Sequence, residues 1–202
     1  MIMKQLQIVG GSNPGRFTKL SDEASYNLFP IDGGIMTYPG YTSIGSLGSG
    51  EARGFFHSVL GGFAIAVIGN QVFRINSFSP VSSSVVGTLA TSLGFVWIVE
   101  NGNSQIAISD NAAYYVYKYS TPVDFSSHDV GGIPGMLAEA LGYIFVALSG
   151  TNGFKYTAVN DATNFPLQNA GSLGSDRIAA LTNMNDWIYV HGQRSVKAWR
   201  TV

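Results

Sequence analysis

The sequence contains no cysteine and few charged residues. Because it has no cysteine, the chain forms no disulfide and offers no thiolate to a metal. This composition fits a protein made in a cytoplasm. Charged residues make up 11% of the chain, less than half of the usual share of about 25%. The net charge is -1, and no two basic residues are adjacent. Proteins that grip DNA or anionic membranes through charge need a basic patch, so the sequence argues against such a binder.

Long apolar runs are also missing. A run such as residues 63–68 is only six residues long, whereas a membrane-spanning helix needs about 18 to 20. The first residues carry one lysine but no long apolar stretch after it, so no secretory signal is expected. Apolar residues nevertheless make up 46% of the chain and aromatic residues 12%. We therefore expect a folded protein with a real core and no membrane anchor.

Glycine and serine separate short β-branched and aromatic runs along most of the chain, a pattern typical of an all-β fold. Helical candidates are weak, because residues 12–26 lack a clean 3.6-residue period and residues 135–140 are too short. We expect almost no helix.

The clearest pattern is an internal repeat that begins at Phe55. Each unit has an apolar strand, a turn, a second apolar strand, a second turn, and a third strand rich in Tyr, Phe and Val. Gly61 and Gly102, in the first turns of two units, are 41 residues apart, and Gly142 follows 40 residues later. The first turns fall at residues 61–62, 101–103, 141–142 and 183–185, and the second turns at 69–70, 110–111, 150–153 and 191–193.

A period near 40 residues with several antiparallel strands per unit is typical of β-propeller blades. The sequence thus predicts an all-β, propeller-like domain over residues 55–202, with four units visible and the last one incomplete. Polar fourth strands are expected at 85–89, 128–130 and 167–172, and residues 194–201 would be the third strand of the last unit. A β-sandwich is the alternative fold. The residues expected to face the interior are Ile65, Val67, Ile144, Val146, Trp187, Ile188 and Val190.

Residues 1–54 lie outside the repeat and carry several Pro-Gly and Gly-Ser turns among aromatic residues. They are too aromatic for a free linker, so we expect an extended leader that packs on the propeller or on a neighbouring subunit. Three arrangements would cover the open edge of the last unit. In the first, the gene product continues beyond this sequence and supplies the missing strand. In the second, residues 4–9 of the leader close the ring. In the third, a neighbouring subunit pairs with the open edge.

No catalytic, cofactor or metal site is predicted. Residues 10–15 have the G-x-x-x-x-G spacing of a phosphate loop, but Arg16-Phe17 follows instead of Lys-Ser/Thr. No G-x-S-x-G elbow is present. The three histidines are widely separated, so surface or turn-capping roles are expected for His57, His128 and His191. Turn acids that bond backbone amides of their own turns are expected at Asp110, Asp161, Asp176 and Asp186.

Four tyrosines fall close together at Tyr114, Tyr115, Tyr117 and Tyr119. They could form a sugar-stacking platform, but their alternation with Val116 and Lys118 favours packing between blades. A glycosidase would need two facing carboxylates, an arrangement that a sequence cannot reveal.

Several segments carry a family resemblance. These are Ala24–Pro30, Tyr38–Thr42, Arg53–Ser58, Val72–Ile75, Gly142–Val146, Asn160–Thr163 and Ile188–Trp199. In these segments the chain resembles the tail nozzles, or packaged-DNA stabilisation proteins, of short-tailed Salmonella-type phages. The resemblance spans nearly the whole chain, although family members are usually longer.

The resemblance implies a structural virion protein, not an enzyme and without a cofactor. It would be made in the host cytoplasm and built into the tail as a homo-oligomer, a hexamer. Its partners would be the portal-adaptor and the tail needle or tailspike proteins, and it would block or pass DNA sterically. Low charge suits a plug that must not grip DNA. Two other classes stay open: a carbohydrate-binding propeller that recognises a host or substrate glycan, and a propeller enzyme acting on a polysaccharide.

Overall fold

The computed structural model describes residues 28–31, 34–37, 43 and 45–200. The chain divides into two compact units, residues 1–43 and 44–202. In the first unit, β1 (Leu28–Ile31) and β2 (Gly34–Thr37) pair as an antiparallel hairpin. The phosphate-loop spacing at 10–15 and the proposed closing strand at 4–9 lie outside the described residues.

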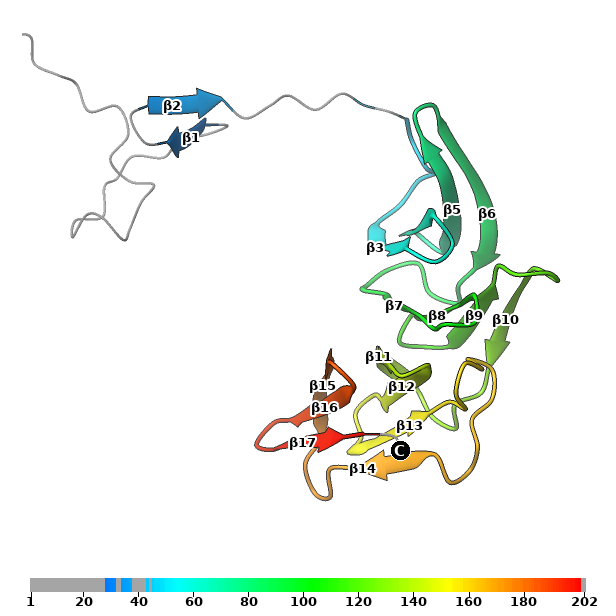
Figure 1. The fold of residues 1–202 in the computed structure, drawn as a ribbon, viewed down its shortest axis with the longest axis vertical. Helices are drawn as coiled ribbons and strands as arrows, with labels where there is room; N and C mark the ends of the chain where they lie inside the picture. Colours follow the sequence, from blue (N-terminus) through cyan, green and yellow to red (C-terminus); the bar gives the residue numbers. More distant parts are fainter. Residues whose placement is uncertain (1–27, 32–33, 38–42, 44, 201–202) are drawn as a thin grey trace, which may run out of the picture. The chain divides into compact units, whose positions relative to one another are not determined.

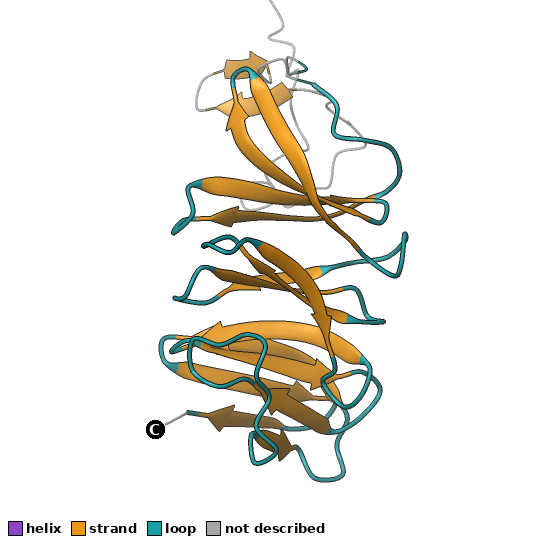
Figure 2. Ribbon diagram, turned by 90° about the vertical axis from the view of Figure 1, so that its right-hand side faces the viewer, coloured by secondary structure: helices purple, strands orange, loops and turns teal. Residues whose placement is uncertain are grey.

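The second unit consists of four antiparallel sheets stacked face to face (Figures 1 and 2). In each sheet the strands neighbour one another in sequence order. Blade 1 contains β3 (Ala52–Ser58), β4 (Phe63–Ile68), β5 (Gln71–Phe78) and β6 (Val81–Thr88). Blade 2 contains β7 (Trp97–Glu100), β8 (Gln105–Ser109), β9 (Tyr114–Lys118) and β10 (Asp124–His128). Blade 3 contains β11 (Pro134–Ala140), β12 (Tyr143–Leu148), β13 (Gly153–Tyr156) and β14 (Ala170–Ser172). Blade 4 contains β15 (Ile178–Met184), β16 (Trp187–Gly192) and β17 (Val196–Trp199).

These blades confirm the all-β fold and the repeat read from the sequence. The predicted turns of blades 1 and 2 and the first turn of blade 3 lie between successive strands. The other three overlap strand ends, at Gly153 of β13, residues 183–184 of β15 and residues 191–192 of β16. No described residue is helical, and no helix in the described part of the chain could span a membrane. The first strands β3, β7, β11 and β15 contact one another in order, so they form the inner edge of the stack. The last strands β6, β10 and β14 form its outer edge.

The core lies between the blades, where apolar faces of adjacent blades meet. Along β4, Ile65 and Val67 face blade 2 and pack with Tyr115 and Tyr117. The blade 2–3 interface and the blade 3–4 interface are built in the same way. The first contains Ala107, Val116, Ile144 and Val146, and the second contains Phe145, Phe154, Ile188 and Val190. Six of the seven predicted interior residues are therefore confirmed, each at most 1% exposed.

Trp187 is the seventh, and its predicted interior position is wrong. Its side chain is 40% exposed, whereas the next residue, Ile188, is buried against blade 3. Successive side chains of a strand point to opposite faces, so Trp187 and Ile188 cannot both face the same neighbouring blade. Trp187 lies instead below the guanidinium of Arg200, 5.8 Å from its ring centre.

Outer strands were harder to place from the sequence than inner ones. The strand expected at 128–130 runs from Asp124 to His128, and Val130 is a buried residue of the connection that follows. The strand expected at 85–89 begins earlier, at Val81, and the one expected at 167–172 spans only Ala170–Ser172. These strands are polar and half exposed, so their sequence carries little periodic signal.

Glycine allows the outer strands of blades 1 and 2 to approach closely. A Cβ atom on Gly87 of β6 would lie 2.5 Å from the ring of Phe125 of β10. That ring in turn stacks on Tyr115, with 5.5 Å between ring centres. Any side chain at position 87 would have to displace the ring, so this glycine serves packing between blades.

The face of blade 1 that points away from blade 2 is partly covered by the chain that precedes it. Leu47 packs on Ala64, Ala66 and Ile75 of this face. Gly48 lies so close to Phe73 that a Cβ atom would be 2.9 Å from the ring. Residues 45–50, part of the predicted leader, thus pack on blade 1.

Candidate functional site

The three histidines do not form a common site. His57 is exposed on β3. His128, at the end of β10, has its Nε2 atom 3.0 Å from the Ser126 hydroxyl, and burial lowers the pKa of its imidazole. His191, on β16, has Nε2 2.8 Å from the Thr182 hydroxyl. His128 and His191 therefore contact strand side chains, and do not cap turns. Among the described residues no group of three His, Cys, Asp or Glu side chains could hold a metal ion.

Two of the four predicted turn acids are confirmed. Asp110 accepts hydrogen bonds from the amides of Ala112 and Ala113 at 3.0 and 2.8 Å. Asp161 accepts bonds from the amide and hydroxyl of Thr163, at 3.1 and 2.7 Å. Both carboxylates thus hold their own turns.

The other two acids differ from that expectation. Asp176 reaches across to the β16–β17 turn, where the amides of Gln193 and Arg194 donate to it at 3.1 and 2.9 Å. Asp186 forms an exposed ion pair with Arg200 at 3.5 Å. Contacts between segments cannot be read from one turn's sequence, which explains both differences.

The tyrosine series packs between blades, as the alternation predicts. Tyr115 and Tyr117 belong to the blade 1–2 core, and Tyr114, on the opposite face of β9, belongs to the blade 2–3 core. Tyr119 packs edge-on against Phe63, with ring centres 5.0 Å apart. Because Tyr114, Tyr115 and Tyr117 are at most 6% exposed, the series is not a surface platform for sugars.

A buried arginine links blades 1 and 2. Arg53 of β3 is only 3% exposed. Its guanidinium donates to the carbonyls of Gly69, Thr91 and Gly94 and to the Thr91 hydroxyl, at 2.6 to 2.9 Å. The amide and hydroxyl of Thr91 in turn donate to Asp110 at 3.0 and 2.9 Å. Arg53 thereby fixes the connection that leads from blade 1 into blade 2.

The Asp-Ala-Thr segment has an equally definite role, because Ala162 is inserted into the boundary between blades 2 and 3. Its side chain is fully buried. Its amide donates to Gln105 Oε1 at 2.7 Å, and its carbonyl accepts the Tyr114 hydroxyl at 2.9 Å. Gln105 also accepts a bond from Asn101 at 2.8 Å. The segment from blade 3 is thus bound at both backbone groups by blade 2.

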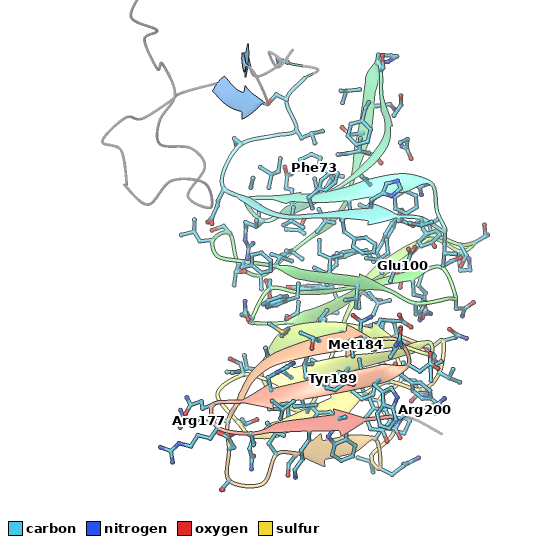
Figure 3. All side chains as sticks on the ribbon, turned by 60° about the vertical axis from the view of Figure 1, so that its left-hand side comes forward. Phe73, Glu100, Arg177, Met184, Tyr189 and Arg200 are labelled. Carbon is cyan, nitrogen blue, oxygen red and sulfur yellow. The ribbon has the colours of Figure 1, made fainter. Side chains whose placement is uncertain are left out.

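A cavity of about 610 Å³ opens along the inner edge of the stack, and we call it the inner groove. All four first strands contribute to it. Its lining consists of Phe56, His57, Val59, Val99, Glu100, Leu137, Ala138, Glu139, Leu181, Thr182 and Asn183. Glu100 and Met184 lie toward one rim of the stack and Arg177 toward the other (Figure 3).

The two carboxylates of the inner groove are both engaged by neighbours. Glu100 Oε1 accepts the hydroxyls of Ser58 and Tyr119, at 2.5 and 2.6 Å. Glu139 Oε1 accepts the amide of Gly142 at 2.7 Å. These bonds fix the positions of two negative charges at one end of an otherwise uncharged lining.

A second cavity, of about 520 Å³, lies between blades 3 and 4. Aromatic residues line it together with polar ones, including Tyr143, Tyr156, Trp199, Gln168 and Asn169. The indole N–H of Trp199 is buried and has no hydrogen-bond partner among the described residues. We call this cavity the aromatic pocket.

Solved structures resemble the chain in fold alone. The crystal structure of the N-terminal domain of Nup159 is similar with a TM-score of 0.52 at 15% identity, over 77% of this chain and 43% of that one. BBS1N in complex with ARL6DN gives a TM-score of 0.48 at 14% identity, over 68% and 46% of the two chains. The chain therefore spans less than half the length of these structures. No curated protein sequence matches it.

The family comparison is more informative, because it covers nearly all of the chain. Residues 5–202 match the phage-stabilisation family described as bacteriophage P22 Gp10, β-propeller. The match includes every segment that carried the sequence resemblance and all four blades. The chain belongs to this phage-stabilisation family of β-propeller proteins.

Proposed function

We propose that the protein is a tail-nozzle subunit of a short-tailed phage. It would sit below the portal and adaptor rings, seal the packaged DNA and then form the conduit for ejection. The observation that carries the proposal is the family match over residues 5–202. A structural phage protein follows from the family itself, and the position in the tail is our proposal.

The proposed seal is steric, and the distribution of charge supports it. The net charge is -1. The charged residues in the lining of the inner groove are carboxylates, which repel phosphates. Arg53, which could attract phosphate, is buried and bonded to carbonyls. A protein that blocks DNA without gripping it can release the DNA when the block opens.

The proposed assembly is a homo-hexamer that contacts the portal-adaptor and the tail needle or tailspike proteins. Adjacent exposed apolar side chains, such as Val59 and Leu60 in the β3–β4 turn, support contacts with other subunits, because exposed apolar patches often mark interfaces. Examples that are at least 60% exposed are Val59, Leu60, Leu93, Phe95, Leu167 and Met184. The protein would be made in the host cytoplasm and become part of the virion tail.

Disruption of the gene tests this role. Without the protein, heads should fill with DNA and then lose it, so their DNA should become sensitive to added nuclease. Supplying the complete gene product in trans should restore nuclease resistance. Electron microscopy of the restored particles should show six copies below the adaptor. Disrupted particles that keep their DNA, or a copy located in the head shell, would refute the nozzle role.

A carbohydrate-binding propeller is the second candidate, and the aromatic pocket favours it. Aromatic faces with nearby amide side chains are typical of sugar sites, and the indole N–H of Trp199 is a donor without a partner among the described residues. A glycan array probed with the chain would test this. Binding that is lost in Tyr156→Ala but kept in Tyr189→Ala would support the sugar site, and an array without binding would reject it.

A further inference from the structure

The inner groove combines apolar walls with charge of one sign. Leu137 and Leu181 are 5% and 4% exposed and form its floor, together with Val99. The polar residues are the carboxylates Glu100 and Glu139, together with His57, Thr182 and Asn183. A ligand that fits this lining must be largely apolar and must carry a positive charge at one end.

The two carboxylates are held in place by hydrogen bonds and still have free acceptor positions for such a ligand. Ser58 and Tyr119 donate to Glu100 through a single oxygen, Oε1, and Gly142 donates to Oε1 of Glu139. A carboxylate has about four acceptor positions on two oxygens, so each keeps capacity for a further donor. Because their side chains are already ordered, binding a cation would cost little additional conformational entropy.

Exposed apolar side chains surround the same end of the groove. They occur at or beside the turns that join the first and second strands of the blades, a region we call the first-turn rim. Its exposed members are Val59 (80%), Leu60 (65%), Met184 (60%) and Leu141 (46%). Val59 also lines the groove, so the apolar rim and the cavity are continuous. Protein interfaces combine such apolar contacts with a few fixed polar groups.

We propose that the inner groove and the first-turn rim bind a loop of a partner protein that presents an arginine between apolar residues. The apolar part of the arginine side chain would lie along Val99 and Leu137, and its guanidinium would pair with Glu100 and Glu139. Arginine fits better than lysine, because its planar donors can serve two carboxylates and its stem packs well on apolar walls. Nucleic acids and anionic lipids do not fit, because the carboxylates repel phosphate.

This surface goes beyond the nozzle role and does not depend on it. The groove is formed entirely within one chain, so it should bind its ligand whether or not the protein forms a hexamer. A failed binding test would leave the genome-retention experiment intact, and a failed genome-retention experiment would leave this binding test intact.

Fluorescence anisotropy with labelled cyclic peptides tests the proposal on the 202-residue chain. The probe contains one arginine flanked by two leucines on each side, and the two comparison peptides carry glutamine or glutamate instead. The arginine peptide should bind at least about tenfold more tightly than the glutamine peptide, as expected for a charge-assisted pair. The glutamate peptide should bind more weakly still.

Paired variants locate the site. Glu100→Gln with Glu139→Gln keeps the size of both side chains and should weaken binding of the arginine peptide by about tenfold or more. Asp124→Asn with Asp129→Asn removes the same charge elsewhere and should change it less than about twofold. Val59→Ser should weaken binding about threefold or more. Leu167→Ser should not, because this side chain is 93% exposed and lies outside the groove.

Several results would overturn the proposal. These are equal affinities for the arginine and glutamine peptides, equal losses in the two double variants, and no binding up to about 1 mM peptide. If the chain self-associates and Val59→Ser abolishes that association, the surface binds a second copy of the chain. This result would also overturn the proposal of a partner loop. Circular dichroism of each variant would confirm that the blades are intact.

Discussion

The hydroxyl of Tyr114 donates a hydrogen bond of 2.9 Å to the carbonyl of Ala162, across the boundary between blades 2 and 3. The two residues are 48 positions apart in the chain. Ala162 has no exposed surface, and its amide is held by Gln105. The contact therefore joins two blades through buried polar groups, where a missing partner is costly.

The first prediction concerns this bond. Tyr114→Phe keeps the ring and its edge-on contact with Phe165, whose ring centre is 5.2 Å away, but leaves the Ala162 carbonyl without that donor. We expect the free energy of unfolding to fall by about 1–3 kcal/mol, measured by urea denaturation. Tyr189→Phe, on a half-buried side chain, should change it by less than about 0.5 kcal/mol. Equal effects in both variants would contradict a special role for Tyr114.

The second prediction is a loss of stability at alkaline pH. Burial, together with the nearby negative charge of Asp161, raises the pKa of Tyr114 well above its usual range. In the unfolded chain the phenol ionises at about pH 10, so above that pH the native state binds one more proton than the unfolded state. Stability is therefore full below pH about 10 and falls as the pH rises further.

Tyr114→Phe removes this contribution. Its stability should decline less steeply than that of the unmodified protein, by up to about 1.4 kcal/mol per pH unit above pH 10. Urea midpoints measured at steps between pH 9 and about 11.5 would show the difference. Parallel curves for the two proteins would mean that Tyr114 ionises freely in the folded state.

The third prediction concerns acid stability and Asp110. Burial by itself raises the pKa of this carboxyl, but hydrogen bonds from Ala113, Thr91 and Ala112 outweigh it and lower the pKa below its usual value. A carboxyl with a lowered pKa contributes stability above its unfolded pKa, near pH 4, and loses that contribution as the pH falls further. Asp110→Asn should therefore be less stable at pH 7 and should lose less on acidification.

Thermal melts between pH 7 and pH 3 check this expectation. At pH 7 the free energy of unfolding of Asp110→Asn should be lower by about 1–3 kcal/mol, because the partly buried amides of Thr91 and Ala113 and the Thr91 hydroxyl lose a charged acceptor. Asp124→Asn, at an exposed carboxyl of β10, should follow the unmodified protein within about 0.5 kcal/mol. A gap between Asp110→Asn and the unmodified protein that stays constant with pH would refute the linkage.

Short-range patterns in the sequence predicted the blades well. The turns recur at a fixed spacing, and the second strands are continuous apolar runs, so Ile65, Val67, Ile144 and Val146 could be assigned to the interior. The interior position predicted for Trp187 is wrong, because its apolar character does not show that strand alternation places it on the face opposite to Ile188. The bounds predicted for the polar outer strands are wrong because these strands lack a contrast between an apolar and a polar face.

Contacts between blades could not be predicted in the same way. Gln105 and Ala162 are separated by 57 residues, and Arg53 and Thr91 by 38. Their meeting depends on how one blade stacks on the next, which no local pattern specifies. The inner groove is even harder to predict from the sequence, because four strands from four repeats each supply a part of its lining.

The fourth prediction tests the packing between blades 2 and 3. Ile144 has no exposed surface and packs in the cluster that includes Tyr114, Val116 and Ala162. Ile144→Ala should cost about 2–5 kcal/mol, from lost burial and from the cavity that remains. Ile133→Ala makes the same chemical change at a side chain that is 58% exposed, and should cost less than about 1 kcal/mol. A neutral Ile144→Ala in a urea titration would contradict the assigned interface.

The last prediction is weak affinity for DNA. The net charge is -1, and three of the arginines are already engaged within the chain. Arg53 is buried, Arg74 lies 4.0 Å from the centre of the Phe63 ring, and Arg200 pairs with Asp186.

With few cations available, binding to a labelled 20-base-pair duplex should be no tighter than about 10 μM at 50 mM salt, and its affinity should vary little up to 200 mM. Glu100→Gln with Glu139→Gln removes two negative charges and should strengthen binding only slightly, because it creates no array of cationic phosphate contacts. Sub-micromolar binding that weakens steeply with salt would show that several phosphates displace their counterions on this protein. The steric seal would then have to be replaced by one in which the subunit holds the DNA directly.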